Sequence, residues 1–104
     1  MIAAIFFRGP AWDDASGIVG QSGFAGHLKR VERYRDHGSG PIIETAPFHD
    51  PRSPVEDELF GLGLLDVESI EAARAVVDDD PVVRAGVLTY RLYEWGGEPL
   101  RRSP

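Results

Sequence analysis

Two residues that lie far apart in the sequence, His27 and Asp80, have the side chains of an acid–base pair. His27 falls within residues 24–38 (FAGHLKRVERYRDHG), where apolar residues recur at the spacing of one helix face. The apolar residues that share this face with His27 are Phe24, Leu28, Val31 and Tyr34. Because an imidazole ring gains and loses a proton near neutral pH, a histidine in this place suits general acid or base catalysis. A lone histidine on an apolar face is also common as a hydrogen-bonded core residue, so a catalytic role requires a carboxylate within its reach.

The segment DDDPVVRAG, residues 78–86, supplies a candidate carboxylate. Asp80 directly precedes Pro81, which favours an extended backbone at Asp80 and suits the first position of a short helical turn. On this pattern alone Asp80 is an N-cap, whereas Asp78 and Asp79 are typical of solvated turn charges. The acid–base pair is predicted only if the fold brings Asp80 next to His27.

The elements that must position this pair follow the order βαββαβ. Strands are predicted over residues 2–8, 41–48, 58–67 and 87–95, and helices over residues 24–37 and 69–77, with Ser69 as the second N-cap. Right-handed crossovers place both helices on one face of a four-stranded antiparallel sheet. Prolines in the second strand indicate an edge or a bulge, and residues 9–23 form a long loop of the kind that often carries function. The charged residues of the first helix would occupy its solvent side: Lys29, Arg30, Glu32, Arg33 and Asp36.

The sheet face opposite the helices is predicted to be apolar and would be exposed to solvent in a monomer. The first strand is apolar on both faces, and the last strand offers apolar residues in both alternating sets. Because a large exposed apolar face is unusual on a monomer, we predict a homodimer packed sheet to sheet. Residues 1–95 would form the domain, and residues 96–104 a flexible C-terminal tail.

Composition argues against several classes of partner. The 104 residues suffice for one domain, and a net charge of −6 without a basic stripe argues against a nucleic-acid partner. The chain has no cysteine, which fits a reducing cytoplasm. Its apolar opening, MIAAIFF, is too short for a signal-peptide core, and no segment is long enough to span a membrane. We therefore expect a cytoplasmic protein without a membrane or nucleic-acid partner.

Cofactor and metal signatures are missing from the sequence. His49 and Asp50 have no third ligand at a helpful spacing, so we expect no metal site. The glycine-rich residues 17–23 lack the Lys-Ser or Lys-Thr pair of a phosphate-binding loop, and no dinucleotide or flavin motif occurs. Any chemistry is therefore expected to run without a cofactor.

Two segments, AGHLKRVERYRDHG and ARAVVDDDPVVRAGVLTYRLYEW, resemble the YCII-related family of small dimeric α/β-barrel proteins, whose protomer has a ferredoxin-like βαββαβ fold. The more specific part of the resemblance is Asp80-Pro81 followed by Ala85-Gly86 before the last strand. In that family, a histidine of the first helix and the aspartate of the Asp-Pro motif form a proposed catalytic dyad, which by position corresponds to His27 and Asp80.

The chain departs from the family pattern at two places that bear on pocket shape. Val82 stands where the family often has an aromatic residue, and Thr45-Ala46-Pro47 stands where it favours Ala-Gly-Pro. The resemblance therefore carries over the dyad, and the substrate of any relative does not follow from it.

The resemblance implies a pocket between the helix layer and the sheet that holds a small-molecule substrate. Asp80 would fix the tautomer of His27, and the pair would remove a proton and return it elsewhere. This suits elimination, dehydration or double-bond isomerisation, so we expect a cofactor-independent lyase or isomerase acting on a small cyclic or aromatic-like molecule. The alternatives are a cofactorless oxygenase and a non-catalytic ligand-binding or accessory protein.

Further residues are candidates for substrate contacts. Arg8, at the end of the first strand, would bind a substrate carboxylate or phenolate, or else is a solvated strand-end cation. Aromatic side chains would form the pocket walls, although aromatics on strands are often plain core residues. The candidate wall residues are Phe7, Trp12, Phe48 and Tyr93.

Overall fold

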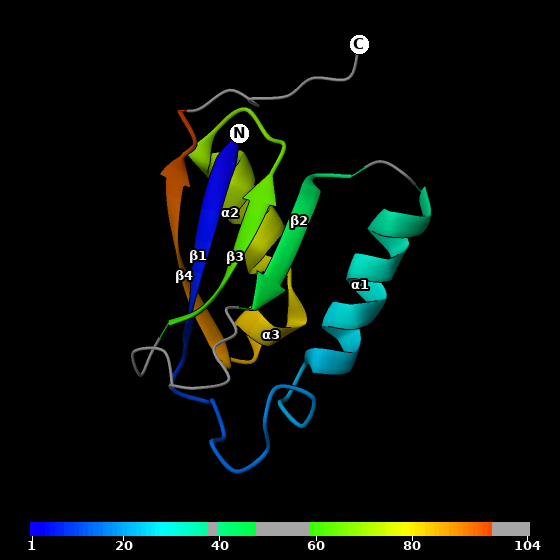
Figure 1. Cartoon of the computed structure of the whole chain (residues 1–104), viewed down its shortest axis with the longest axis vertical. Helices are drawn as coiled ribbons and strands as arrows, with labels where there is room; N and C mark the ends of the chain where they lie inside the picture. Colours follow the sequence, from blue (N-terminus) through cyan, green and yellow to red (C-terminus); the bar gives the residue numbers. More distant parts are fainter. Residues whose placement is uncertain (38–39, 48–58, 97–104) are drawn as a thin grey trace.

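The computed structural model describes residues 1–37, 40–47 and 59–96, which form one antiparallel sheet with helices beside it (Figure 1). The strands are β1 Ile2–Arg8, β2 Ile42–Pro47, β3 Leu59–Leu65 and β4 Leu88–Glu94, and the helices are α1 Phe24–His37, α2 Ile70–Asp78 and α3 Pro81–Arg84. The four strands lie in the order β2-β3-β1-β4. This α+β arrangement confirms the predicted element order, adds α3 as a single turn, and is consistent with a ferredoxin-like fold.

Local sequence signals account for several element boundaries. β2 lies at an edge of the sheet, as its prolines predicted, and its register with β3 shifts between Ile42 and Glu44. Ser69 caps α2 as predicted, because its hydroxyl accepts the Ala72 N–H at 3.0 Å. Some predictions fall outside the described residues: the wall residue Phe48, the His49 and Asp50 pair, and the tail beyond Gly96.

The main core lies between the sheet and α2. Ile2 and Ala4 of β1 pack with Leu65 of β3 and with Ala73 and Val77 of α2, and all five residues are buried. The alternation of side chains along β1 therefore assigns its even-numbered residues to the helix side of the sheet.

Two glycines of β3 leave space on the helix side of the sheet. Ala4 pairs with Gly63 and Phe6 pairs with Gly61 across the β1–β3 ladder. Because paired residues point to the same face, both glycines lie on the side of α2 and place no side chain there. Space therefore remains beside Phe6.

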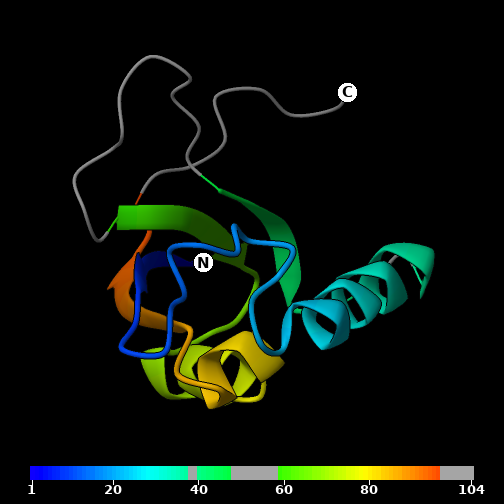
Figure 2. The same ribbon diagram turned by 90° about the horizontal axis from the view of Figure 1, so that it is seen from below.

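Helix α1 packs closely on α3, and Figure 2 shows the two side by side. A Cβ atom on Gly26 would lie 2.9 Å from the Cγ atom of Pro81, nearer than side-chain atoms normally approach. Gly23, just before α1, has a positive φ of 84°, and a Cβ atom there would lie 2.6 Å from the Pro81 carbonyl oxygen. The two glycines thus permit the approach of α1 to the turn that follows Asp80.

Filling this contact should destabilise the protein. We expect Gly26→Val to lower the free energy of unfolding by about 1–3 kcal/mol, because the added methyl groups must displace the Pro81 ring. Urea unfolding measures the change, with the exposed neighbour Ala25→Val as the control for helix propensity. Equal effects of the two substitutions would contradict the close packing of α1 on α3.

The loop between β1 and α1 is held in place by a buried glutamine. Gln21 is only 5% exposed, and its amide group donates to the carbonyl oxygens of Asp13, at 2.6 Å, and Gly17, at 2.8 Å. Its side-chain oxygen accepts the Asp13 N–H at 2.8 Å. These bonds order the segment that carries Ile18, whose side chain lines the cavity beside His27.

Candidate functional site

Asp80 is fixed by the start of α3. It has an extended backbone, and its Oδ1 atom accepts the Val82 N–H at 3.0 Å, with Pro81 in the first turn. The prediction of an N-cap is therefore confirmed. Because the cap uses one carboxylate oxygen, the other oxygen is free to contact a neighbouring helix.

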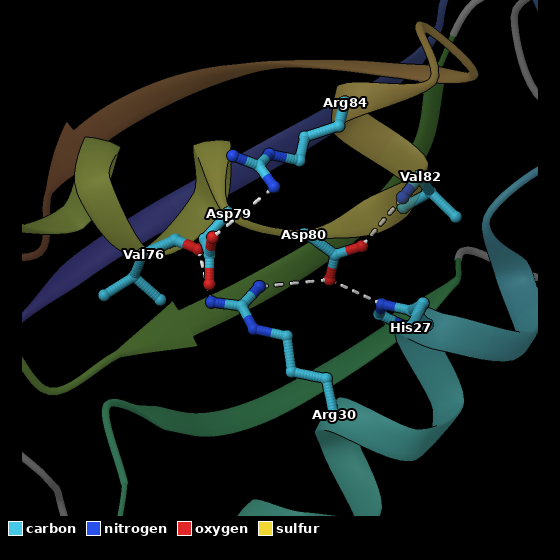
Figure 3. Close-up of polar contacts among 7 residues, drawn as sticks. All are labelled: His27, Arg30, Val76, Asp79, Asp80, Val82 and Arg84. Carbon is cyan, nitrogen blue, oxygen red and sulfur yellow. Dashed lines mark hydrogen bonds and ion pairs between the residues drawn. The ribbon is translucent and has the colours of Figure 1, made fainter.

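That second oxygen meets His27. The Nδ1 atom of His27 lies 2.7 Å from Oδ2 of Asp80, and Figure 3 shows the ring of α1 directed toward the carboxylate. The His27 side chain is 24% exposed and that of Asp80 is 9% exposed, so the contact is shielded from water on most sides. The expectation that the fold brings these two side chains together is confirmed.

Arg30 joins the same carboxylate, which corrects the prediction that it lies on the solvent side of its helix. It is 9% exposed, and its Nη1 atom donates to Oδ2 of Asp80 at 3.3 Å. Its Nη2 atom donates to the Val76 carbonyl oxygen at 2.5 Å. The prediction was wrong because a guanidinium is normally solvated, whereas here a carboxylate and a carbonyl replace water. The spacing held a usable signal, since Arg30 is three residues after His27 and shares its side of the helix.

The apolar stripe of α1 is also less buried than the pattern predicted. Leu28 is 43% exposed, whereas Phe24, Val31 and Tyr34 are half-buried. The helix is therefore turned so that the side of His27 and Arg30 faces α2 and α3.

Burial and hydrogen bonding act in opposite directions on the pKa of Asp80. Burial raises it, whereas the hydrogen bond and charge of His27, the Val82 N–H and the charge of Arg30 lower it. The lowering contacts prevail, so the pKa of Asp80 lies below its ordinary value of 3.8. At neutral pH the carboxylate is ionised and can only accept, so Nδ1 of His27 must donate. A neutral ring then keeps Nε2 as its proton acceptor.

Acid should remove the contribution of Asp80 to stability. The unfolded chain protonates this carboxyl near its ordinary pKa of 3.8, whereas the folded chain protonates it only at lower pH. The contribution is therefore complete above that window and is lost as the pH falls through the folded pKa. Urea unfolding of the parent and of Asp80→Asn, from about pH 6 to about pH 2.5, measures this effect. We expect the stability advantage of the parent to shrink below about pH 4, and an advantage independent of pH would contradict this origin.

A cavity of about 260 Å³ lies beside the pair, and both His27 and Asp80 line it. Thr45 of β2 is the other polar side chain in its wall, among the residues described. The remaining lining residues are apolar: Phe6, Ile18, Phe24, Leu28, Val31, Phe60, Val82 and Leu88. A second cavity, of about 30 Å³, is lined by Arg30 as well as by the two members of the pair. The imidazole and its carboxylate thus border a mostly apolar space.

Two of the predicted substrate contacts lie near this cavity without lining it. The guanidinium carbon of Arg8 lies 5.3 Å from the centre of the Trp12 ring, and that ring lies 5.5 Å from the ring of Phe60. Phe60 is the aromatic residue of this group that borders the cavity. The structure therefore brings Arg8 and Trp12 to a wall residue, and not to His27 itself.

Two other predicted wall residues lie on the opposite face of the sheet. Phe7 is next to Phe6 in β1 and so points away from α2, where the Arg91 guanidinium carbon lies 5.4 Å from its ring centre. Tyr93 pairs with Ala3 across β1 and β4 and is 51% exposed. The structure does not bring either side chain to the cavity beside His27.

The described residues hold no group of three or more His, Cys, Asp or Glu side chains that could bind a metal ion. Within the same residues, no helix has the length and apolar character needed to cross a membrane.

The chain matches a protein-family model, and the matched residues include the site. Residues 13–96 match the family model of the YCII-related domain, and this match spans α1, the three later strands, His27 and Asp80. It extends over 84 of the 104 residues, from 13 to 96 inclusive. No curated protein matches the chain.

Proposed function

Because the chain belongs to the YCII-related family, we propose that it is a cofactor-independent lyase or isomerase in which His27 acts as general acid and base and Asp80 orients it. The observation that carries this proposal is the 2.7 Å contact between Nδ1 of His27 and Asp80, beside a cavity that both residues line. An imidazole oriented by a buried carboxylate and open to an apolar space is well suited to proton transfer to and from carbon.

The proposed reaction begins with removal of a proton from an acidic C–H bond by Nε2 of His27. The electron pair of that bond moves toward the neighbouring carbon, and either a leaving group departs or a double bond shifts. Asp80 stabilises the imidazolium through its bond to Nδ1, and the ring then returns the proton to the leaving group or to another carbon. The proton balance closes without an external oxidant or metal.

The cavity supports a small substrate with an apolar body. An apolar cavity of about 150 Å³ holds benzene, so about 260 Å³ leaves room for roughly ten non-hydrogen atoms. The aromatic side chains Phe6, Phe24 and Phe60 in its wall suit a flat ring, and Thr45 adds a hydroxyl near the pair. A small cyclic or aromatic-like molecule with one acidic C–H bond fits these features.

Hydrogen–deuterium exchange at carbon tests the proton-removal step by itself, whichever product the later steps give. The protein is incubated in deuterated water with a panel of small cyclic ketones and substituted hydroquinones, and NMR follows loss of each C–H signal. We expect catalysed exchange for at least one compound that also binds, and the exchange should be independent of oxygen. Oxygen-dependent turnover would favour an oxygenase instead. Binding without exchange across the panel would favour a ligand-binding protein.

We also propose that two copies pair through the sheet face opposite α2. Tyr93 on that face is 51% exposed, and Trp95, just beyond β4, is 49% exposed. Large aromatic side chains left this exposed are typical of an interface. Light scattering on the eluting peak of a sizing column should give the mass of a dimer for the parent and a smaller mass for Tyr93→Glu. A monomeric parent would contradict the pairing.

A further inference from the structure

Arg30 is the buried charged residue closest to the acid–base pair whose role the proposed reaction leaves open. Its side chain is 10% exposed and spans three elements: it begins on α1, donates to the Val76 carbonyl oxygen of α2 and reaches Asp80 at the start of α3. Its guanidinium carbon also lies 5.7 Å from the centre of the Tyr34 ring, one turn further along α1. Because these contacts hold the guanidinium in place, its positive charge stays at a fixed distance from the Asp80 carboxylate.

The contact falls on the same atom that binds His27. Oδ2 of Asp80 receives Nδ1 of His27 at 2.7 Å and Nη1 of Arg30 at 3.3 Å, whereas Oδ1 is used by the Val82 N–H. Figure 3 shows the two side chains of α1 converging on this oxygen. The negative charge that would hold a proton on the imidazole is therefore shared with a permanent cation.

We propose that Arg30 is a positioning residue that limits how strongly Asp80 holds a proton on His27. Its importance for turnover rests on the proposed function, but its effect on the ring does not. Without Arg30, the full charge of Asp80 would act on His27, and a nearby positive charge that opposes the imidazolium would also be lost. Both changes favour the protonated ring.

Other charged side chains near the pair, within the described part of the chain, contact partners of their own. Asp79 pairs with Arg84 at 4.0 Å, and both of these side chains are about 70% exposed. Asp78, at the end of α2, accepts the hydroxyl of Tyr90 at 2.5 Å. The residues that the four strands bring to the cavity are uncharged: Phe6, Thr45, Phe60 and Leu88. Among the described residues, Arg30 is thus the cation that contacts the carboxylate of the pair.

NMR titration of the histidine rings in isotope-labelled protein tests the inference without a substrate. The pH at which the His27 ring is half protonated is compared between the parent, Arg30→Met and Arg30→Gln. We expect both substitutions to move this midpoint upward by at least about half a pH unit, roughly a threefold change in proton affinity. Arg30→Gln leaves a polar but uncharged side chain at this position, so it serves if Arg30→Met does not fold.

Two further variants separate this effect from general disturbance. Arg33→Met removes the same charge from an exposed position one turn along α1 and should leave the midpoint near that of the parent. Arg30→Lys restores the charge and should bring the midpoint closer to the parent than Arg30→Gln does. Midpoints of the neutral Arg30 variants that shift no further than that of Arg33→Met would overturn the inference. A clear shift in a protein that exchanges no C–H proton would uphold the inference and refute the proposed function.

Discussion

Replacing His27 with glutamine should slow catalysed C–H exchange at least about 100-fold while leaving the fold intact. Glutamine is close to histidine in size and keeps an N–H donor near Oδ2 of Asp80, although this donor lies one bond further from the backbone than Nδ1, which now makes the 2.7 Å contact. An amide cannot take up a proton at neutral pH, so the variant separates the acid–base role of the ring from its packing role. The loss should appear in the rate of exchange, with little change in the affinity for the same compound.

The matched control for His27→Gln is Leu28→Gln, which places the same side chain on the next residue. Leu28 also lines the cavity but is 43% exposed, so its replacement should alter binding more than the rate of exchange. Equal losses of exchange rate in both variants would mean that the rate depends on the shape of the cavity wall and not on the imidazole. Exchange that persists at the parent rate in His27→Gln would remove His27 from the mechanism.

Replacing Asp80 with alanine should be one of the most destabilising single changes in the chain. It leaves the buried guanidinium of Arg30 without its counter-charge, which typically costs about 3–5 kcal/mol, and it removes the cap of α3, worth about 1 kcal/mol. Urea unfolding at neutral pH measures the loss. Asp80→Asn should cost less, because the asparagine side chain can still accept the Val82 N–H, although the charge is gone.

Asp79→Ala provides a control one residue away. The Asp79 side chain is 68% exposed and lies 4.0 Å from Arg84, so its loss should change the free energy of unfolding by less than about 1 kcal/mol. Similar losses at the two positions would contradict the burial and pairing of Asp80. An Asp80→Ala protein that is too unstable to purify, beside a well-folded Asp79→Ala protein, agrees with the expected ranking.

The parts of the site that rest on local chemistry could be predicted from the sequence. An aspartate directly before a proline is a strong N-cap signal, and the structure has Asp80 in that role. The helical spacing around His27 predicted that it would face inward, and the element order predicted that its helix packs over the sheet whose last strand follows Asp80. The pair was predicted only on the condition that the fold brings the two residues together, and the structure meets this condition because α1 and α3 meet beside the sheet.

Arg30 escaped prediction because its burial depends on partners from other elements. A helical pattern assigns a charged residue to the solvent side, since an isolated cation is expensive to bury. Only the fold brings the Val76 carbonyl and the Asp80 carboxylate to the same place. Arg30 lies three residues after His27, which places the two side chains on the same side of the helix. This spacing indicates that Arg30 is buried only once His27 is known to face Asp80.

The residues that line the cavity could not be predicted for a different reason. Phe6 and Phe7 are adjacent and equally apolar, so β1 gives no sign of which residue faces the helices. The structure assigns Phe6 to the cavity and leaves Phe7 beneath Arg91 on the other face. Phe60 and Thr45 were missed for the same reason, because the facing of β2 and β3 is set by pairing across the sheet.

The carboxylate of Asp80 performs two tasks with its two oxygens, one at the start of α3 and one on the ring of His27. Because one carboxylate makes both contacts, unwinding this four-residue turn would displace the group that orients the imidazole, so the alignment of the ring depends on the turn. Transferring the pair to another protein would therefore require transferring the whole Asp-Pro turn, because the turn fixes the position of the Asp80 carboxylate.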